Sequence, residues 1–193
     1  METPFIWITI GMIAFMVLSI MGAFLSFYKK VPQGKAIIRT GAGGPLIEYD
    51  KGIFVIPILH KMEFLDISLK KVEITKMNEE SLACKDGTKA GIKAAFFIRA
   101  RRDEIDLLQI AQSFGCQAAS DPKALHGIFH SSFLEAIKKA LKAFDYEDSY
   151  RDIDMLKVEI LRNIGPDLKG FTLDDIAIDY FEKTKPQYLE NNV

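Results

Sequence analysis

An uncharged and strongly apolar segment near the N-terminus constrains this chain more than any other feature. The segment extends from Phe5 to Phe27 and reads FIWITIGMIAFMVLSIMGAFLSF. As an α-helix it would be ~34 Å long, at ~1.5 Å per residue. The hydrocarbon core of a bilayer is ~30 Å thick. Because soluble domains rarely build a helix that is apolar on every side, residues 1–28 are predicted to form a short tail and a transmembrane anchor.

The charges that flank this segment predict its direction. Lys29 and Lys30 follow it directly, whereas Glu2 is the one charged side chain before it. Because Lys and Arg close to a span favour the cytoplasmic side, we expect the N-terminus outside and residues 29–193 in the cytoplasm. A cleaved signal peptide is the alternative, but such a peptide starts with basic residues and has a shorter apolar core. The opening Met-Glu-Thr-Pro lacks basic residues, so we favour an uncleaved, single-pass anchor.

Composition bears on the partners and the compartment. All 25 Lys and Arg residues follow the anchor, together with all but one of the 26 Asp and Glu residues. The part after the anchor is thus formally neutral, and nucleic-acid binding, which normally shows as a basic face, is not predicted. Cys84 and Cys116 are far apart and in no metal-like spacing. Two such thiols are typical of a reducing cytoplasm and agree with the predicted orientation.

Beyond the anchor, strand-like patterns give way to helix-like patterns. Lys85-Asp86-Gly87 is a hairpin signal, and Asp121-Pro122 combines an N-cap with proline at the first helical position. The expected elements are strands at 35–40, at 46–49, within 62–84 and at 89–101, helices at 103–114, 122–144 and 147–164, and a final strand at 171–181. The first of these helices has four residues at helical spacing, Ile105, Leu108, Ala111 and Gln112. Because strands run together and helices run together, the predicted class is α+β.

A second apolar stretch, which we call the apolar run, has two interpretations. It consists of Ile53, Phe54, Val55, Ile56, Pro57, Ile58 and Leu59. Proline fits poorly into a central strand or a helix interior. The run is therefore either an edge strand that packs into the core, or a loop that dips into the headgroup region, where exposed apolar side chains are favourable.

Motifs for enzyme chemistry are weak. His126 and His130 stand at i and i+4 of an expected helix, as two metal ligands would, but H-G-I-F-H lacks the glutamate of the H-E-x-x-H hydrolase signal. A third ligand from Asp121 or Glu135 is not specified by any pattern, and two histidines at a helix contact are the other interpretation. The glycine-rich stretch at 41–45 lacks the Gly-Lys-Ser/Thr of a phosphate-binding loop. We predict no catalytic residue, no cofactor and no metal, with His126 and His130 as weak metal candidates.

Several stretches, in order, resemble the flotillin and band 7 group, the SPFH proteins, which include stomatin and prohibitin. The resemblance covers nearly all of the chain after the anchor. It rests on Gln33-Gly34-Lys35-Ala36, IIRTGAGGP at 37–45, the G-x-x-x-x-P-x-x-H pattern at 52–60, Leu69-Lys70 to Glu73, Lys85-Asp86-Gly87, Ala95 to Arg99, and Gly170-Phe171 to Tyr180-Phe181. Thr184, Lys185 and Tyr188 fit the exit from the closing strand.

The resemblance implies an architecture and a set of membrane contacts. It implies a membrane-proximal, strand-rich subdomain at 29–85, an α/β subdomain at 86–185, and the start of a coiled-coil helix at 186–193. In this family the first half often touches the leaflet, which favours membrane contact by the apolar run. Lys29, Lys30, Lys35 and Arg39 would then meet anionic headgroups, each contributing roughly 1 kcal/mol.

The resemblance also implies a function. Family members are non-enzymatic scaffolds that assemble into homo-oligomeric rings or cages and organise membrane microdomains, or lipid rafts. The expected location is the cell membrane, as in the bacterial inner membrane, and the expected partners are lipids, further copies of the chain and other membrane proteins. Since 186–193 would be only the start of the coiled coil, small oligomers are expected for this chain. The alternatives are an adaptor or regulator of a membrane protease or other membrane protein, and a membrane-tethered metallohydrolase that uses His126 and His130.

Overall fold

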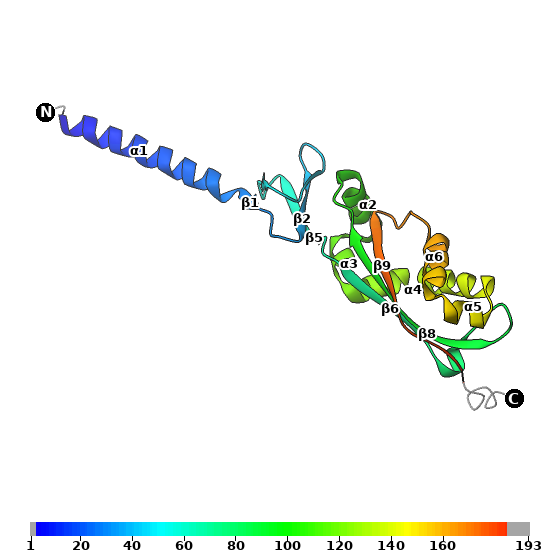
Figure 1. The fold of residues 1–193 in the computed structure, drawn as a ribbon. Coiled ribbons are helices and arrows are strands. Elements are labelled where there is room, and N and C mark those ends of the chain that lie inside the picture. The colour runs from blue at the N-terminus through cyan, green and yellow to red at the C-terminus, as the bar shows by residue number, and fades with distance from the viewer. Residues whose placement is uncertain (1–2, 185–193) are drawn as a thin grey trace. The chain divides into compact units, whose positions relative to one another are not determined.

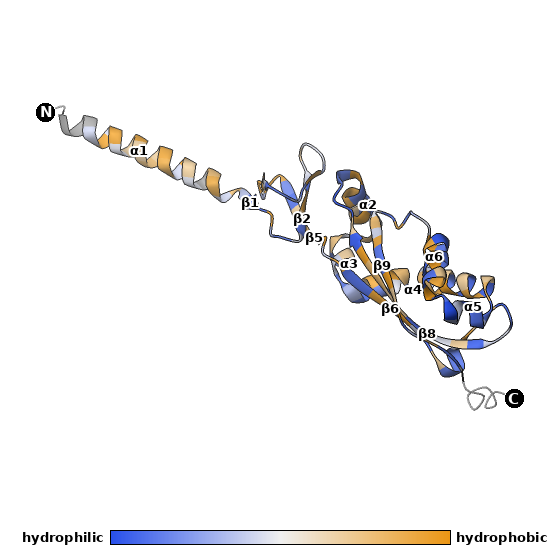
Figure 2. Cartoon of the chain, in the orientation of Figure 1, coloured by the Kyte–Doolittle hydropathy of each residue, from blue (hydrophilic) through white to orange (hydrophobic). Residues whose placement is uncertain are grey.

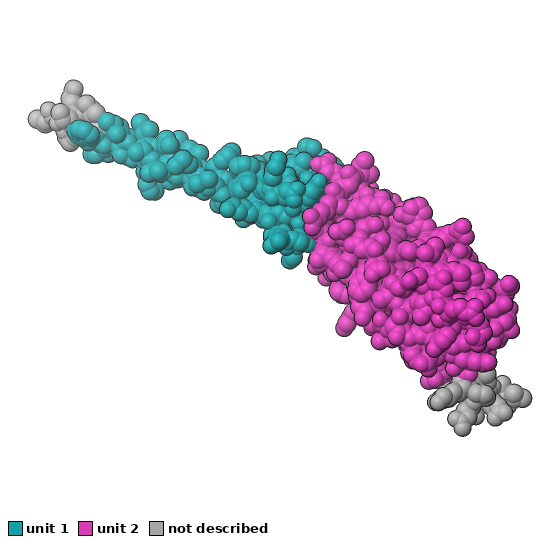
Figure 3. Space-filling view, viewed as in Figure 1, with its two compact units in different colours: residues 1–64 teal, residues 65–193 magenta. Residues whose placement is uncertain are grey.

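The chain forms two compact units, residues 1–64 and residues 65–193 (Figures 1 and 3). A computed structural model describes residues 3–184. The class is α+β, as predicted, with a long apolar helix followed by strands and then by helices and a last strand. The expected start of a coiled coil at 186–193 lies outside the described residues.

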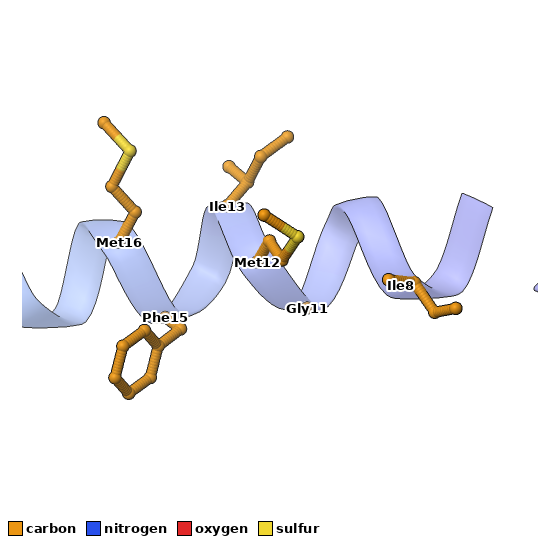
Figure 4. A pocket seen from close by; sticks show the side chains of 6 residues that line it. All are labelled: Ile8, Gly11, Met12, Ile13, Phe15 and Met16. Atoms are coloured by element: carbon orange, nitrogen blue, oxygen red, sulfur yellow. The ribbon is translucent and has the colours of Figure 1, made fainter. Parts of the chain in front are cut away.

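The first unit begins with helix α1, Thr3–Ser26, which contains no charged residue. By length and composition, Trp7–Ser26 is a candidate membrane span, and within residues 3–184 it is the one helix with that character. Most of α1 has hydrophobic colours in Figure 2, and Figure 4 shows the side chains of Ile8, Met12, Ile13, Phe15 and Met16 projecting from it near Gly11. A helix with no polar face has no side to turn toward water, which agrees with the predicted anchor.

Five short strands follow α1. They are β1 (Tyr28–Lys30), β2 (Lys35–Gly41), β3 (Leu46–Glu48), β4 (Gly52–Phe54) and β5 (His60–Asp66). β1 pairs with β4 in an antiparallel ribbon, and a second sheet has the order β3-β2-β5. A small core of Ile37, Ile53 and Val55, with Val31 and Met62 packed against it, lies in this unit.

The second unit is built on an antiparallel sheet. Its strands are β6 (Lys70–Lys76), β7 (Leu82–Ala83), β8 (Lys89–Ala100) and β9 (Phe171–Lys183), with a 3-10 turn, η1, at Asn78–Glu80. β8 pairs with β6 and β7 and with the long β9 (Figure 1). Its helices are α2 (Glu104–Phe114), α3 (Cys116–Ser120), α4 (Pro122–Ala143), α5 (Tyr146–Arg151) and α6 (Ile153–Ile164).

Two local predictions for this unit are reproduced for the reasons that the sequence suggested. The Asp86 carboxylate accepts hydrogen bonds from the backbone N–H and the hydroxyl of Thr88, which closes the turn between β7 and β8. The Asp121 carboxylate accepts from the Lys123 backbone N–H at 3.1 Å and caps α4 ahead of Pro122. Short polar side chains thus fix where these elements begin.

The boundary between the units differs from the predicted subdomain boundary at residues 85/86. It lies between Phe64 and Leu65, because β6 and β7 both pair with β8 and therefore belong to the second unit. Hairpin signals show that two strands are adjacent, but they do not show which strand a third one joins.

Two helices also differ from expectation. The buried residues of α2 are Leu107 and Ile110, whereas Ile105 is 77% exposed. The expected single helix at 147–164 is two helices, α5 and α6, because Asp152 leaves helical geometry. Its carboxylate accepts from the Met155 backbone N–H at 2.9 Å and starts a new helix there.

A buried lysine closes the connection between β5 and β6. Lys70 is 7% exposed, and its ammonium donates to the carbonyls of Asp66 and Ser68 and lies 3.1 Å from the Asp66 carboxylate. That carboxylate also accepts from the backbone N–H and the hydroxyl of Ser68. Burial would raise the pKa of Asp66, but the Ser68 and Lys70 donors outweigh it and hold this pKa below its ordinary value.

This network predicts a pH-dependent contribution to stability. Because the pKa of Asp66 is lower in the folded chain than in the unfolded chain, where it is ~3.9, the contribution is complete above that value and is lost as the pH falls through the folded pKa. Urea unfolding should show Asp66→Asn destabilised by roughly 1–2 kcal/mol at pH 7. The difference from the natural sequence should shrink below about pH 4. An equal difference at pH 7 and pH 3.5 would contradict the assignment.

Candidate membrane-contact site

The apolar run divides into buried and exposed residues. Ile53 and Val55 are 4% and 5% exposed and belong to the core of the first unit. Ile58 is 94% exposed and Leu59 54% exposed. Each interpretation of the run therefore describes part of it, since Ile53 and Val55 pack inward whereas the side chains from Ile56 to Leu59 lie at the surface. We call residues 55–59 the apolar loop.

Backbone bonds give the apolar loop a defined shape. The N–H groups of Leu59 and His60 donate to the Ile56 carbonyl at 3.0 and 2.8 Å. The Ala42 N–H donates to the Leu59 carbonyl at 3.2 Å. Gly41 has φ +124°, and a Cβ there would collide with the Leu59 carbonyl oxygen, so the close approach of the two turns requires glycine.

The apolar loop is tied to the C-terminal end of α1. β1 starts at Tyr28, directly after the helix, and pairs Tyr28 with Phe54. The Phe54 ring centroid lies 5.1 Å from that of Phe24 in the last turn of α1 and 5.3 Å from that of Tyr28. The Val55 N–H donates to the Phe27 carbonyl at 2.9 Å. If α1 spans a bilayer, covalent continuity and these contacts place the loop at the membrane surface.

The cationic residues expected at headgroups are arranged in two ways. Lys29 and Lys30 are exposed on β1, and Lys35 is exposed at the start of β2 with its ammonium 5.9 Å from the Phe64 ring centroid. Arg39 is partly buried and donates to the Phe54 carbonyl at 2.8 Å, and its Nε has no hydrogen-bond partner among the described residues. Arg39 therefore holds β4 in place, a role that its sequence position does not reveal.

The histidine pair of the second unit does not form a recognisable metal site. The His126 and His130 rings lie 5.1 Å apart, and His126 Nε2 lies 3.0 Å from the Glu73 carbonyl oxygen, to which it donates. Asp121 caps α4, and Glu135 pairs with Lys139 at 2.8 Å. Over residues 3–184, no group of three or more His, Cys, Asp or Glu side chains is placed to hold a metal ion.

The surface beside His126 is open. A shallow depression of about 330 Å³ there is lined by Lys71, Glu73, Pro122, Lys123 and His126. The Glu73 carboxylate is paired with Lys71 at 2.7 Å, which lowers the pKa of Glu73. A general base for hydrolysis would need its pKa shifted toward neutrality instead.

The two cysteines lie in the interior of the chain. Cys84 and Cys116 are both buried and form no disulfide. Burial, together with the nearby Asp86 and Asp145 carboxylates, raises the pKa of Cys84 to about 11. A thiol with such a pKa is almost fully protonated at neutral pH and is a poor nucleophile.

Comparison with known proteins gives this arrangement a family. The sequence profile of the SPFH domain / Band 7 family matches residues 29–188, which include both sheets of the first unit and all strands and helices of the second. The chain belongs to the SPFH domain / Band 7 family. The resemblance inferred from the sequence is thereby confirmed.

Two curated relatives of this SPFH chain are similar along nearly all of its length. The flotillin family inner membrane protein YqiK of Escherichia coli (strain K12) is 23% identical over 189 residues, which cover 96% of this chain and 34% of that protein. The flotillin family inner membrane protein sll1021 of Synechocystis sp. (strain ATCC 27184 / PCC 6803 / Kazusa) is 25% identical over 199 residues, which cover 98% of this chain and 29% of that protein. The chain thus spans about a third of the length of either relative.

The SPFH pattern G-x-x-x-x-P-x-x-H acquires a structural meaning here. Its glycine is Gly52, where a Cβ would collide with the Tyr28 ring that covers it. Its histidine is His60, which contacts both turns of the loop region through its two ring nitrogens. Sequence reasoning used His60 only as part of a pattern, and the pattern gives no sign of these two bonds.

Proposed function

We propose that this chain is a non-enzymatic, membrane-anchored SPFH scaffold that associates with further copies of itself and organises the lipids and membrane proteins around it. α1 is the single-pass anchor, and the apolar loop and nearby lysines contact the leaflet into which α1 emerges. The observation that carries the proposal is the apolar loop, with Ile58 almost fully exposed. The loop directly follows Phe54, which packs on the last turn of a helix long enough to span a bilayer.

The same surface supports a direction for the anchor. Lys29, Lys30 and Lys35 are all exposed just after α1, and Lys and Arg close to a span favour the cytoplasmic side. We therefore place residues 29–193 in the cytoplasm and the N-terminus outside. Both curated relatives are named inner membrane proteins, which supports the same membrane for this chain.

Exposed apolar side chains at a membrane surface agree with the proposed contact. Phe54 packs on Phe24 of α1, and Ile56, Ile58 and Leu59, which follow Phe54 closely in the chain, are exposed. Exposure of these side chains to water is unfavourable, whereas their burial in the headgroup region is favourable. The exposed lysines can add roughly 1 kcal/mol each on an anionic surface. Arg39, which donates to the Phe54 carbonyl, would add a further positive charge to this surface.

Self-association is tested by the size of the complete chain in membranes and in detergent. Amine cross-linking in native membranes, followed by light scattering after mild extraction, should show dimers or larger homo-oligomers. As a control, α1 (Thr3–Ser26) fused to a monomeric soluble protein should remain largely uncross-linked, because the assembly surfaces are placed after the anchor. A cross-linking pattern of monomers alone in the native membrane would contradict the scaffold.

The same purified material distinguishes the other candidates. A monomer that retains a transition metal, and loses it in His126→Ala, would favour a metallohydrolase. Stoichiometric recovery of another membrane protein, without association between copies, would favour an adaptor or regulator. Homo-oligomers without bound metal are the result expected of the scaffold.

A further inference from the structure

His60 joins the apolar loop to the neighbouring glycine turn through two hydrogen bonds of opposite direction. Its Nδ1 accepts from the Ile56 backbone N–H at 3.1 Å. Its Nε2 lies 3.2 Å from the Ala42 carbonyl oxygen, which can only accept. The ring therefore joins Ile56, four residues before it in the chain, to Ala42, 18 residues before it.

Only one form of the ring can make both of these bonds. A neutral imidazole has one N–H donor and one acceptor nitrogen. The two contacts are both satisfied only when Nε2 carries the proton and Nδ1 carries none. A second proton on Nδ1 would turn that nitrogen into a donor facing the Ile56 N–H, so the bond would be lost and Ile56 would be left unpaired.

The surroundings of His60 provide no substitute partner. The turn at 41–45 and the apolar loop contain no titratable residue. On the strands packed around the ring, Arg39 of β2 donates to the Phe54 carbonyl, and Glu48 of β3 accepts from the Asp50 and Lys51 backbone N–H groups. The remaining charged side chain on β2 is Lys35, which lies over Phe64. On β5, Lys61 pairs with Glu63, and Asp66 pairs with Lys70.

We propose that His60 is the positioning residue of the membrane-contact site, and that a proton on its Nδ1 releases the apolar loop from the membrane. This inference rests on the proposed membrane contact. The neutral ring holds Ile56 and, through the turn, Ile58 and Leu59 in the exposed arrangement. The protonated ring no longer accepts the bond from the Ile56 N–H. It also carries a positive charge next to the apolar loop, which disfavours burial of the loop in lipid.

The experiment follows residue 58 in the complete chain. Ile58→Cys carries an environment-sensitive fluorophore, since its side chain is 94% exposed and the two native thiols are buried. The unsubstituted chain, treated alike, measures background labelling. Vesicles of zwitterionic phosphatidylcholine remove the attraction of anionic lipid for a cationic ring. Quenching by nitroxide-bearing phosphatidylcholine is then measured between pH 8 and pH 5.

Quenching at residue 58 is expected to fall at least twofold between pH 8 and pH 5. The fall should disappear in His60→Gln, whose amide has the same charge at both pH values, and persist in the matched control His126→Gln. A label at Ser131→Cys, an exposed position of α4, should show little quenching throughout. Hydrogen exchange of β2 amides in His60→Gln establishes that the first unit is folded.

Two different failures can be separated. Strong quenching that does not change with pH in the parent chain, or that changes equally in His60→Gln, would overturn the role of His60 and leave the membrane contact intact. Absence of quenching at residue 58 at every pH would overturn the membrane contact itself and, with it, this inference. If His60→Gln does not fold, His60→Asn takes its place, and a flat profile in the parent chain still overturns the role of His60.

Discussion

Ile53→Asp is expected to unfold the strands of the first unit, whereas Ile58→Asp is expected to leave them folded. Ile53 is 4% exposed and packs with Ile37 and Val55, so a carboxylate there would be buried without a partner. Such burial costs several kcal/mol, which a core this small cannot offset. Ile58 is 94% exposed, so a carboxylate at that position stays in water.

Hydrogen exchange of the complete chain in detergent measures this difference directly. Amides of β2 and β5 should lose protection by at least tenfold in Ile53→Asp and keep it in Ile58→Asp. Amides of β6 and β8 serve as the internal reference, because they belong to the second unit. Equal protection in the two variants would show that the apolar run is not divided between core and surface as described.

Phe133→Ala is expected to destabilise the second unit by roughly 3–5 kcal/mol, the range for a fully buried phenylalanine. The Phe133 ring is inaccessible to solvent and stacks on Phe96 of β8 at 4.4 Å and on Phe129 at 5.4 Å between ring centroids. The substitution leaves a cavity where α4 meets the sheet. Since whole domains are stable by only about 5–15 kcal/mol, this loss removes a large part of the total.

Urea unfolding followed by circular dichroism tests the expectation. Val158→Ala provides the matched control, because Val158 is also apolar and helical but 65% exposed on α6. Its effect should stay within about 0.5 kcal/mol. A similar cost for the two substitutions would mean that α4 does not pack on Phe96 as the structure shows.

The elements that the sequence predicts well are those set by local signals. The turn at Asp86, the start of α4 at Asp121 and the apolar face of β8 follow from residues within a few positions of one another. The inner face of α2 was not predictable in the same way. Leu107, Ile110 and Phe114 form one apolar stripe and Ile105, Leu108 and Ala111 another, and the sheet selects the first. Periodicity alone cannot choose between two such stripes.

Local sequence patterns also fail to predict several features of the candidate site. The sequence indicated the apolar run and the lysines near it. It did not show that the run is divided, with some residues in the core and others at the surface. Ile53 and Val55 face the core on either side of the exposed Phe54, whereas Ile58 and Leu59, in the turn after Ile56, are exposed. The contacts of Arg39 and His60 join segments 15 and 18 residues apart, so no local pattern reveals them.

Contact between the apolar loop and lipid is tested most directly by a spin label at Ile58→Cys in the complete chain, reconstituted in bilayers at pH 7.5. We expect the label to be more accessible to oxygen, which concentrates in lipid, than to a water-soluble nickel complex. A label at Ser131→Cys on α4 should show the opposite preference. Equal preference for the nickel complex at residues 58 and 131 would contradict the membrane contact on which the proposed function rests.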